Sequence, residues 1–293
     1  MSSTTPQTRI STVTADGVEI FYRSAGSSSA PVILLLHGFP SSSHMFRNLI
    51  PLLSTRYHVI APDLPGYGFT TVPSERKYEY TFANLTQTIE SFLDTLKIQK
   101  FAVYIFDYGA PTALRLALDR PSAITAIITQ NGNAYKEGLG SEFWAPIQAY
   151  WQLDSKEDRE KIRAAALNFE TTKWQYTFGS AHPDDIPPEA YYLDSALLDR
   201  PGNQDVQLDL LRDYGTNVEL YPRFQNYLKT SGVPVLAVWG KNDQIFIAPG
   251  AEAYKKDVKD IEINYLDAGH FALETNEGEV SNLILAFLQK RHL

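Results

Sequence analysis

The sequence predicts an α/β fold in which a mostly parallel sheet is flanked by helices. Near-continuous apolar runs of strand length alternate with stretches that carry apolar residues at helical spacing. Strands that are apolar on both faces are typical of parallel sheets covered by helices on both sides. The chain has 293 residues, of which 44% are hydrophobic, so it can bury a large core.

The first predicted strand, residues 18–22, alternates between apolar and polar side chains, and the later ones are buried runs. These runs are residues 31–36, 57–61, 101–106, 124–129, 233–239 and 261–266. Residues 82–96 are predicted to form a helix because their apolar side chains recur every three or four positions. Residues 1–15 are polar and rich in Ser and Thr, and we expect them to be a frayed terminus.

The stretch from Asn133 to Lys229 has a different residue pattern. Strand-like runs disappear, and helical patterns and aromatic residues take their place. We interpret this stretch as a helical insertion that lies over the carboxyl ends of the strands. The predicted domains are a core formed by residues 1–132 and 230–293 and a helical cap formed by residues 133–229.

Composition argues against several classes of partner. The formal net charge is −8 and no basic stripe occurs, so nucleic acid is not expected. No apolar run approaches the roughly 20 residues that span a bilayer, so a membrane is not expected either. The chain has no cysteine, which removes disulfides, thiol catalysis and Cys-based zinc sites. The amino-terminal residues lack the apolar core of a secretory signal, so a cytoplasmic location is the default expectation.

Asp107 is the most informative residue of the chain. It follows the apolar run 101–106, and the chain then turns at Gly109-Ala110 into a stretch with helical spacing. This strand–turn–helix context is typical of a nucleophile elbow. A carboxylate is already ionised at neutral pH and attacks without help from a base. Because attack on an acyl carbon would give a high-energy anhydride, Asp107 predicts chemistry at an sp3 carbon, such as that of an epoxide or a halide.

Two further residues follow buried strands at positions suited to catalysis. Asp243 comes just after the run 233–239, and His270 comes just after the run 261–266. Because functional groups in open α/β sheets gather at the carboxyl ends of the strands, both are expected to converge with Asp107. Taken singly, Asp243 could be a turn-capping carboxylate and His270 an ordinary loop histidine.

The segment His37-Gly38-Phe39-Pro40 supplies a candidate anion site. The backbone N–H of Phe39 can point at a developing oxyanion, and the N–H of Tyr108 supplies a second donor. His37 itself is interpreted as a hydrogen-bonded scaffold histidine rather than a base.

Taken together, these motifs resemble the α/β-hydrolase superfamily, in particular its branch with an aspartate nucleophile. The resemblance rests on His37-Gly-Phe-Pro40, Asp63-Leu-Pro-Gly-Tyr-Gly68, Trp239-Gly-x-x-Asp243 and Gly269-His-Phe271. It implies a helical cap inserted after the sixth strand. It also implies that Asp107 is the nucleophile, that Asp243 orients His270, and that His270 activates the water that hydrolyses the ester on Asp107.

The same resemblance suggests hydrogen-bond donors in the cap. Epoxide hydrolases of this branch use two cap tyrosines, and the segment around Tyr214 resembles the one that carries the second. The first is ambiguous, because alternative alignments place Ile147, Tyr150 or Trp151 there. Dehalogenases often hold the halide with a Trp after the nucleophile, and fluoroacetate-type enzymes place an Arg there. Here Tyr108 occupies that position, which disfavours a small acidic substrate.

The leading expectation is an epoxide hydrolase that forms a covalent alkyl-enzyme ester and releases a vicinal diol. A haloalkane dehalogenase is the close alternative, and a non-hydrolytic catalyst or ligand-binding protein on the same scaffold is the third. An esterase is the weakest reading, since Asp107 would have to attack a carbonyl. The expected partners are a small apolar organic substrate and water. No metal or other cofactor is expected, and the sequence leaves a monomer and a homodimer equally open.

Overall fold

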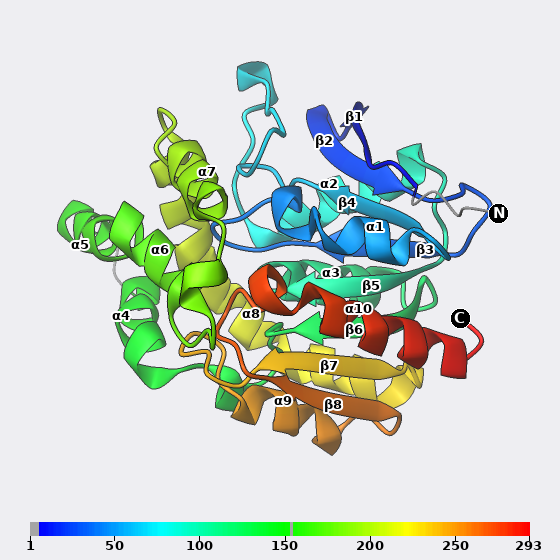
Figure 1. Ribbon diagram of the computed structural model, residues 1–293. Helices are drawn as coiled ribbons and strands as arrows, with labels where there is room; N and C mark the ends of the chain where they lie inside the picture. Colours follow the sequence, from blue (N-terminus) through cyan, green and yellow to red (C-terminus); the bar gives the residue numbers. More distant parts are fainter. Residues whose placement is uncertain (1–5, 153–154) are drawn as a thin grey trace.

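The computed structural model describes residues 6–152 and 155–293, and its centre is one sheet of eight strands (Figure 1). The strands are β1 (Arg9–Ala15), β2 (Val18–Ala25), β3 (Val32–Leu36), β4 (His58–Pro62), β5 (Phe101–Phe106), β6 (Ile124–Gln130), β7 (Val235–Gly240) and β8 (Ile261–Leu266). Their spatial order is β1-β2-β4-β3-β5-β6-β7-β8. Strand β2 pairs antiparallel with β1 and β4, and every pair from β4 to β8 is parallel.

Helices cover both faces of this sheet, as the apolar strands predict. Consecutive residues of β3 and β5 alternate between two apolar clusters: Leu34 and Val103 belong to one, and Leu35 and Tyr104 to the other. The first cluster includes residues of α2 (Phe82–Thr95), α3 (Gly109–Asp119), α8 (Asn203–Ser231) and α9 (Pro249–Ala253). The second includes residues of α1 (Leu49–Leu53) and α10 (Leu273–Lys290). The predicted fold class is therefore confirmed.

The amino-terminal prediction is wrong in part. Residues 9–15 are the edge strand β1, joined to β2 by the two-residue turn Asp16-Gly17, where both residues have positive φ angles. An Asp-Gly pair is a strong hairpin signal because this turn needs positive φ at both positions. Most side chains of β1 are exposed, so the strand carries no apolar run by which its composition could reveal it.

The stretch between β6 and β7 is helical in its described residues, 133–152 and 155–229. Its helices are α4 (Ser141–Gln152), α5 (Lys156–Ala166), α6 (Phe169–Thr177), α7 (Pro188–Leu198) and α8. In Figure 1, α4 to α7 gather beyond one end of the sheet, and α8 runs from that group back along the sheet, in contact with α2 and α3. Residues 1–5 of the predicted core and 153–154 of the predicted cap lie outside the described residues. The division of the chain into two domains stays a prediction.

Within residues 6–152 and 155–293, no helix is both long and apolar enough to cross a bilayer.

Candidate active site

Asp107 lies on a sharp turn between β5 and α3. Its φ angle is +46°, in the left-handed region that non-glycine residues rarely adopt. The turn leaves no room for a side chain at Gly109, where a Cβ atom would lie 2.3 Å from the backbone oxygen of Leu36. The sequence therefore needs glycine there so that the chain can fold back into α3. The result is a carboxylate held at the carboxyl end of a central strand.

The carboxylate of Asp107 is bonded to two backbone N–H groups. Phe39 N donates to Asp107 Oδ1 at 2.7 Å, and Tyr108 N donates to the same oxygen at 2.6 Å. The structure thus brings together the two donors that the sequence suggests for an oxyanion. In the structure, both N–H groups donate to Oδ1 of Asp107 itself, and neither donates to Oδ2.

His270 faces the other carboxylate oxygen. Its Nε2 lies 3.9 Å from Asp107 Oδ2, and its Nδ1 lies 2.8 Å from Asp243 Oδ2. The Nε2 atom is buried and has no hydrogen-bond partner among the described residues. A gap of 3.9 Å beside an unpaired nitrogen is the geometry that a bridging water or a reacting substrate atom would fill.

The carboxylate of Asp243 also accepts hydrogen bonds from two groups that do not belong to Asp107 or His270. Ile245 N donates to Asp243 Oδ1 at 2.7 Å, and Asn131 Nδ2 donates to Asp243 Oδ2 at 2.8 Å. Sequence reasoning missed Asn131, although a polar residue just past buried strand β6 was a usable signal. These bonds orient the carboxylate toward His270.

The pKa values of the facing groups are shifted by burial and by their neighbours. Burial raises the pKa of Asp107 to about 6, while His270 and the N–H groups of Phe39 and Tyr108 oppose that rise. Burial would lower the pKa of His270, but the carboxylates of Asp243 and Asp107 outweigh it and raise the pKa above its ordinary value. Shifts of this kind, caused by burial and facing charges, are typical of functional sites.

His37 lies behind the Asp107 turn and takes no part in this triad. Leu64 N donates to His37 Nε2 at 2.9 Å, so Nδ1 carries the proton that it donates to the Gly38 oxygen at 3.0 Å. Burial lowers the pKa of the imidazole, and the ring packs edge-on against Tyr67. Through these contacts, the uncharged imidazole connects the loop after β3 with the loop after β4.

The cap residues suggested as donors differ in what they contact. The Tyr214 ring lies 5.7 Å from the Tyr108 ring, and its hydroxyl is 3.4 Å from the Tyr221 hydroxyl. The Tyr150 hydroxyl instead donates to the Leu208 oxygen at 3.4 Å and accepts from Arg159. The Trp151 indole N–H donates to the Leu211 oxygen at 3.0 Å. Only Tyr214 of these three has its ring directly against the Asp107 turn.

Two tyrosine hydroxyl groups near this turn are unpaired within the described residues. Tyr67 Oη and Tyr108 Oη are buried and have no hydrogen-bond partner among the described residues. In the sequence, Tyr108 occupies the position where dehalogenases of this branch often carry a halide-binding Trp, and Tyr67 is part of a loop motif. The direction of a phenol depends on the packing around it, so the sequence could not predict which hydroxyls lack a partner.

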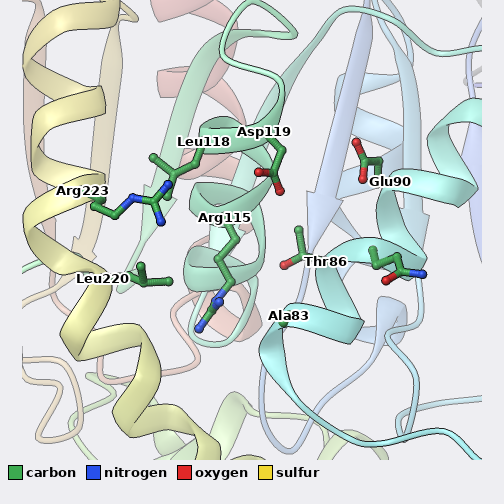
Figure 2. Close-up of a pocket in the computed structure, with 9 residues that line it drawn as sticks. Ala83, Thr86, Glu90, Arg115, Leu118, Asp119, Leu220 and Arg223 are labelled. Atoms are coloured by element: carbon green, nitrogen blue, oxygen red, sulfur yellow. The ribbon is translucent and has the colours of Figure 1, made fainter.

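Figure 2 shows a separate cleft of about 380 Å³ between α2, α3 and α8. None of Asp107, Asp243 and His270 lines it. Arg115, one of the residues that line it, donates to Asn217 Oδ1 at 2.8 Å and to Thr216 Oγ1 at 2.7 Å. These bonds attach α3 to the turn of α8 that follows Tyr214, so the cleft supports the site without belonging to it.

Across residues 6–152 and 155–293, no three His, Cys, Asp or Glu side chains come together in a way that could hold a metal ion. Asp107, His270 and Asp243 come together as a group of residue types suited to nucleophilic catalysis.

Comparisons with known proteins agree with this architecture. A family profile described as "alpha/beta hydrolase fold" matches residues 31–277. An uncharacterized hydrolase of Saccharomyces cerevisiae is 50% identical over 274 residues, 92% of this chain and 93% of that protein. Epoxide hydrolase 3 of Siraitia grosvenorii is 27% identical over 318 residues, 95% of this chain and 98% of that protein. The solved structure of the haloalkane dehalogenase DatA from Agrobacterium tumefaciens C58 superposes with a TM-score of 0.80 at 21% identity, covering 97% of each chain.

Proposed function

Since this chain belongs to the α/β hydrolase fold family, we propose that it hydrolyses its substrate through a covalent ester on Asp107. The observation that carries the proposal is that the two oxygens of that carboxylate have different hydrogen-bonding surroundings. Oδ1 accepts from Phe39 N and Tyr108 N, whereas Oδ2 lies 3.9 Å from His270 Nε2. One oxygen is thus held in an anion site and the other faces the reacting position.

In the first step, Asp107 Oδ2 attacks an sp3 carbon of the substrate. A C–O bond forms, the bond from that carbon to the leaving atom breaks, and the leaving atom takes the electron pair. An epoxide oxygen then needs a proton, whereas a halide needs only hydrogen-bond donors. Asp107 needs no base for this step, since a carboxylate attacks in its ionised form.

In the second step, water attacks Cγ of the ester on Asp107. His270 Nε2 takes the water proton, and the negative charge develops on Oδ1, which already lies between two N–H donors. Each such donor typically contributes about 3 kcal/mol to lowering the barrier. The ester bond then breaks, and the product oxygen, formerly Oδ2, takes the proton back from His270. Asp243 stabilises the imidazolium while it exists.

Epoxide opening is favoured over halide release by the contacts of three of the four tryptophans. Indole N–H groups commonly hold the halide in dehalogenases of this branch. Here the indole N–H groups of Trp144, Trp151 and Trp239 donate to backbone oxygens at 2.9, 3.0 and 2.8 Å. Phenol hydroxyls near Asp107 are better suited to protonate an alkoxide. The proposed reaction is therefore the hydrolysis of an apolar epoxide to a vicinal diol, and halide release is the second candidate.

Aromatic rings around the Asp107 turn support an apolar substrate. Tyr214 packs against Phe82, Trp144 and Phe246, with ring centroids between 4.5 and 6.3 Å apart. Phe246 in turn lies 6.1 Å from the His270 ring. A wall of this kind binds carbon-rich surface and excludes bulk water from the ester.

The test is a single turnover in heavy-oxygen water, followed by mass analysis of the peptide that contains Asp107. Because water attacks Cγ, label is expected in the Asp107 side chain and not in the first product molecule. Label in the product alone would refute the ester mechanism. Panels of epoxides and haloalkanes decide the substrate class, since halide release without diol formation would favour the second candidate.

Asp107→Asn separates an enzyme from a binding protein on the same scaffold. The amide cannot displace a leaving group, so turnover is expected to fall below detection. Tyr57→Phe serves as the control, because the Tyr57 hydroxyl donates to the Leu293 oxygen, far from Asp107 in the fold. Turnover by Asp107→Asn equal to that of the parent would support a scaffold role for this residue.

A further inference from the structure

Residues 176–181, here called the α6 end, are hydrogen-bonded to the loops after β7 and β8. Asn242 Nδ2 donates to the Gly179 oxygen at 2.8 Å and to Asp267 Oδ1 at 3.1 Å. Ala181 N donates to the Asp267 oxygen at 3.3 Å. These loops carry two of the three proposed catalytic residues, so a helix from the stretch between β6 and β7 is fixed to both of them.

The α6 end and the loop after β8 touch through their backbones. At Gly269, directly before His270, a Cβ atom would lie 1.9 Å from the backbone oxygen of Phe178. Only glycine allows such a close approach. Gln175, in the last turn of α6, lines a narrow crevice together with Asp243 and His270. A shift of α6 would therefore push directly on the loop that carries the histidine.

The residue after His270 is held by an aromatic stack. The Tyr176 and Phe271 rings lie within 10° of parallel, with centroids 3.8 Å apart. The Phe271 ring also packs against Phe106 at 5.1 Å, and Phe106 directly precedes Asp107. Tyr176 thus belongs to a row of aromatic contacts that reaches the nucleophile turn.

The hydroxyl of Tyr176 fixes the ring in this position. Tyr176 Oη donates to Asp194 Oδ2 in α7 at 2.5 Å. The two residues are 3% and 1% exposed, so loss of this bond would leave a buried carboxyl group without this partner, which is costly. The ring and the hydroxyl together connect α6 and α7 to Phe271.

We propose that Tyr176 and the α6 end position the imidazole of His270 for the second step of the reaction. This inference rests on the proposed function and deepens it, because it assigns the placement of the base to helices outside the sheet. Tyr176 is a positioning residue, since it acts through Phe271 and not on the substrate. The gap of 3.9 Å between His270 Nε2 and Asp107 Oδ2 is the distance that this packing maintains. A displacement of about 1 Å in such a geometry can cost on the order of 10²-fold in rate.

The proposed role concerns one step only. Asp107 attacks in its ionised form and needs no base, so ester formation does not depend on where the imidazole lies. Ester hydrolysis does depend on it, because His270 Nε2 takes the proton of the attacking water. Loss of positioning should therefore slow ester hydrolysis alone and let the ester on Asp107 accumulate.

The experiment measures the two steps separately, by rapid quench and mass spectrometry of the peptide that contains Asp107. Tyr176→Leu removes the stack, and Asn242→Ala removes the donor to Gly179. Both variants are expected to keep the parent rate of ester formation and to slow ester hydrolysis at least about tenfold. Tyr176→Phe keeps the ring on Phe271, so it is expected to restore ester hydrolysis close to the parent rate.

Arg200→Met is the matched control. Arg200 Nη1 donates to the Gly68 oxygen at 2.8 Å, so this variant breaks another hydrogen bond between the helices of residues 133–229 and a loop of the sheet. That loop follows β4 and carries neither the acid nor the histidine. The variant is expected to keep the parent rates of both steps.

Equal slowing of both steps in Tyr176→Leu or Asn242→Ala would indicate general damage and overturn the inference. Parent-like ester hydrolysis in either variant, or the same loss in Arg200→Met, would overturn it too. Thermal midpoints identify folded variants, and Asn242→Ala decides the matter if Tyr176→Leu does not fold. Absence of an ester even in His270→Asn, in which ester hydrolysis lacks its base, would instead refute the proposed function.

Discussion

Gly38→Ala tests whether the anion site around Asp107 Oδ1 is as confined as the structure indicates. A Cβ atom at position 38 would lie 2.1 Å from Asp107 Oδ1 and 2.5 Å from Tyr108 N. Ordinary contact begins at 3.4 Å, so the carboxylate oxygen must move by about 1.3 Å. Gly38 does not have a positive φ angle, so the effect is one of space and not of backbone conformation.

The magnitude follows from the two donors. Oδ1 accepts from Phe39 N at 2.7 Å and from Tyr108 N at 2.6 Å, and a shift of this size takes it out of hydrogen-bond range of at least one of them. Loss of one such donor typically costs 10²–10³ in rate, or about 3 kcal/mol. We therefore expect Gly38→Ala to slow ester hydrolysis at least ~10²-fold, as measured by stopped-flow after the ester has formed.

Gly278→Ala is the matched control, since a Cβ atom there meets nothing within 4 Å and the residue lies on the exposed side of α10. It is expected to keep the parent rate. Parent-like hydrolysis by a folded Gly38→Ala protein would show that ester hydrolysis does not need both N–H groups at Oδ1.

Three further predictions concern charge. Asp107 attacks only as a carboxylate and its pKa is about 6, so kcat/KM is expected to rise roughly tenfold from pH 5 to pH 7; a flat profile would contradict this. Asp243→Asn leaves His270 without its orienting charge, so ester hydrolysis should slow by about 10³–10⁴ and the ester on Asp107 should accumulate in rapid-quench samples. Burial raises the pKa of Asp194 well above its ordinary value, although Tyr176 donates to it at 2.5 Å and opposes the rise. The folded chain therefore holds a proton that the unfolded chain loses above about pH 4, and stability falls as pH rises through that range. Asp194→Asn should remove this loss, so urea unfolding should show its advantage over the parent growing from pH 5 to pH 8, and a pH-independent difference would refute the assignment.

The parts of the fold that depend on apolar burial could be predicted from the sequence. Runs such as 101–106 and 233–239 are buried on both faces, and their residues are apolar for that reason. Strand β1 was not predicted, because most of its side chains face solvent and its composition therefore carries no signal. Hydrogen bonding to β2 forms this strand. The Asp16-Gly17 turn was the signal available.

The candidate site likewise contains residues that the sequence could predict and residues that it could not. Asp107, Asp243 and His270 could be singled out because each follows a buried strand, and parallel strands bring such positions to one edge. The donors suggested in the cap could not be settled in this way, because the contacts of 17 tyrosine hydroxyls depend on packing that the sequence does not show. Tyr150 was one of the suggested donors, yet its hydroxyl contacts Leu208 and Arg159, whereas the hydroxyl of Tyr67 has no partner in the described residues.

Under the proposed mechanism, the charges at the site would prepare His270 to act as a base only after the ester has formed. The carboxylate of Asp107 helps to raise the pKa of His270 in the resting protein. Once Asp107 becomes an ester its charge is gone, so the pKa of His270 should fall and the neutral imidazole should become the dominant form. Asp107→Asn mimics the uncharged ester, and an NMR titration of His270 in that variant should give a lower pKa than in the parent. An unchanged or higher pKa would mean that Asp243 alone sets the protonation of His270, and that ester formation does not prepare the base.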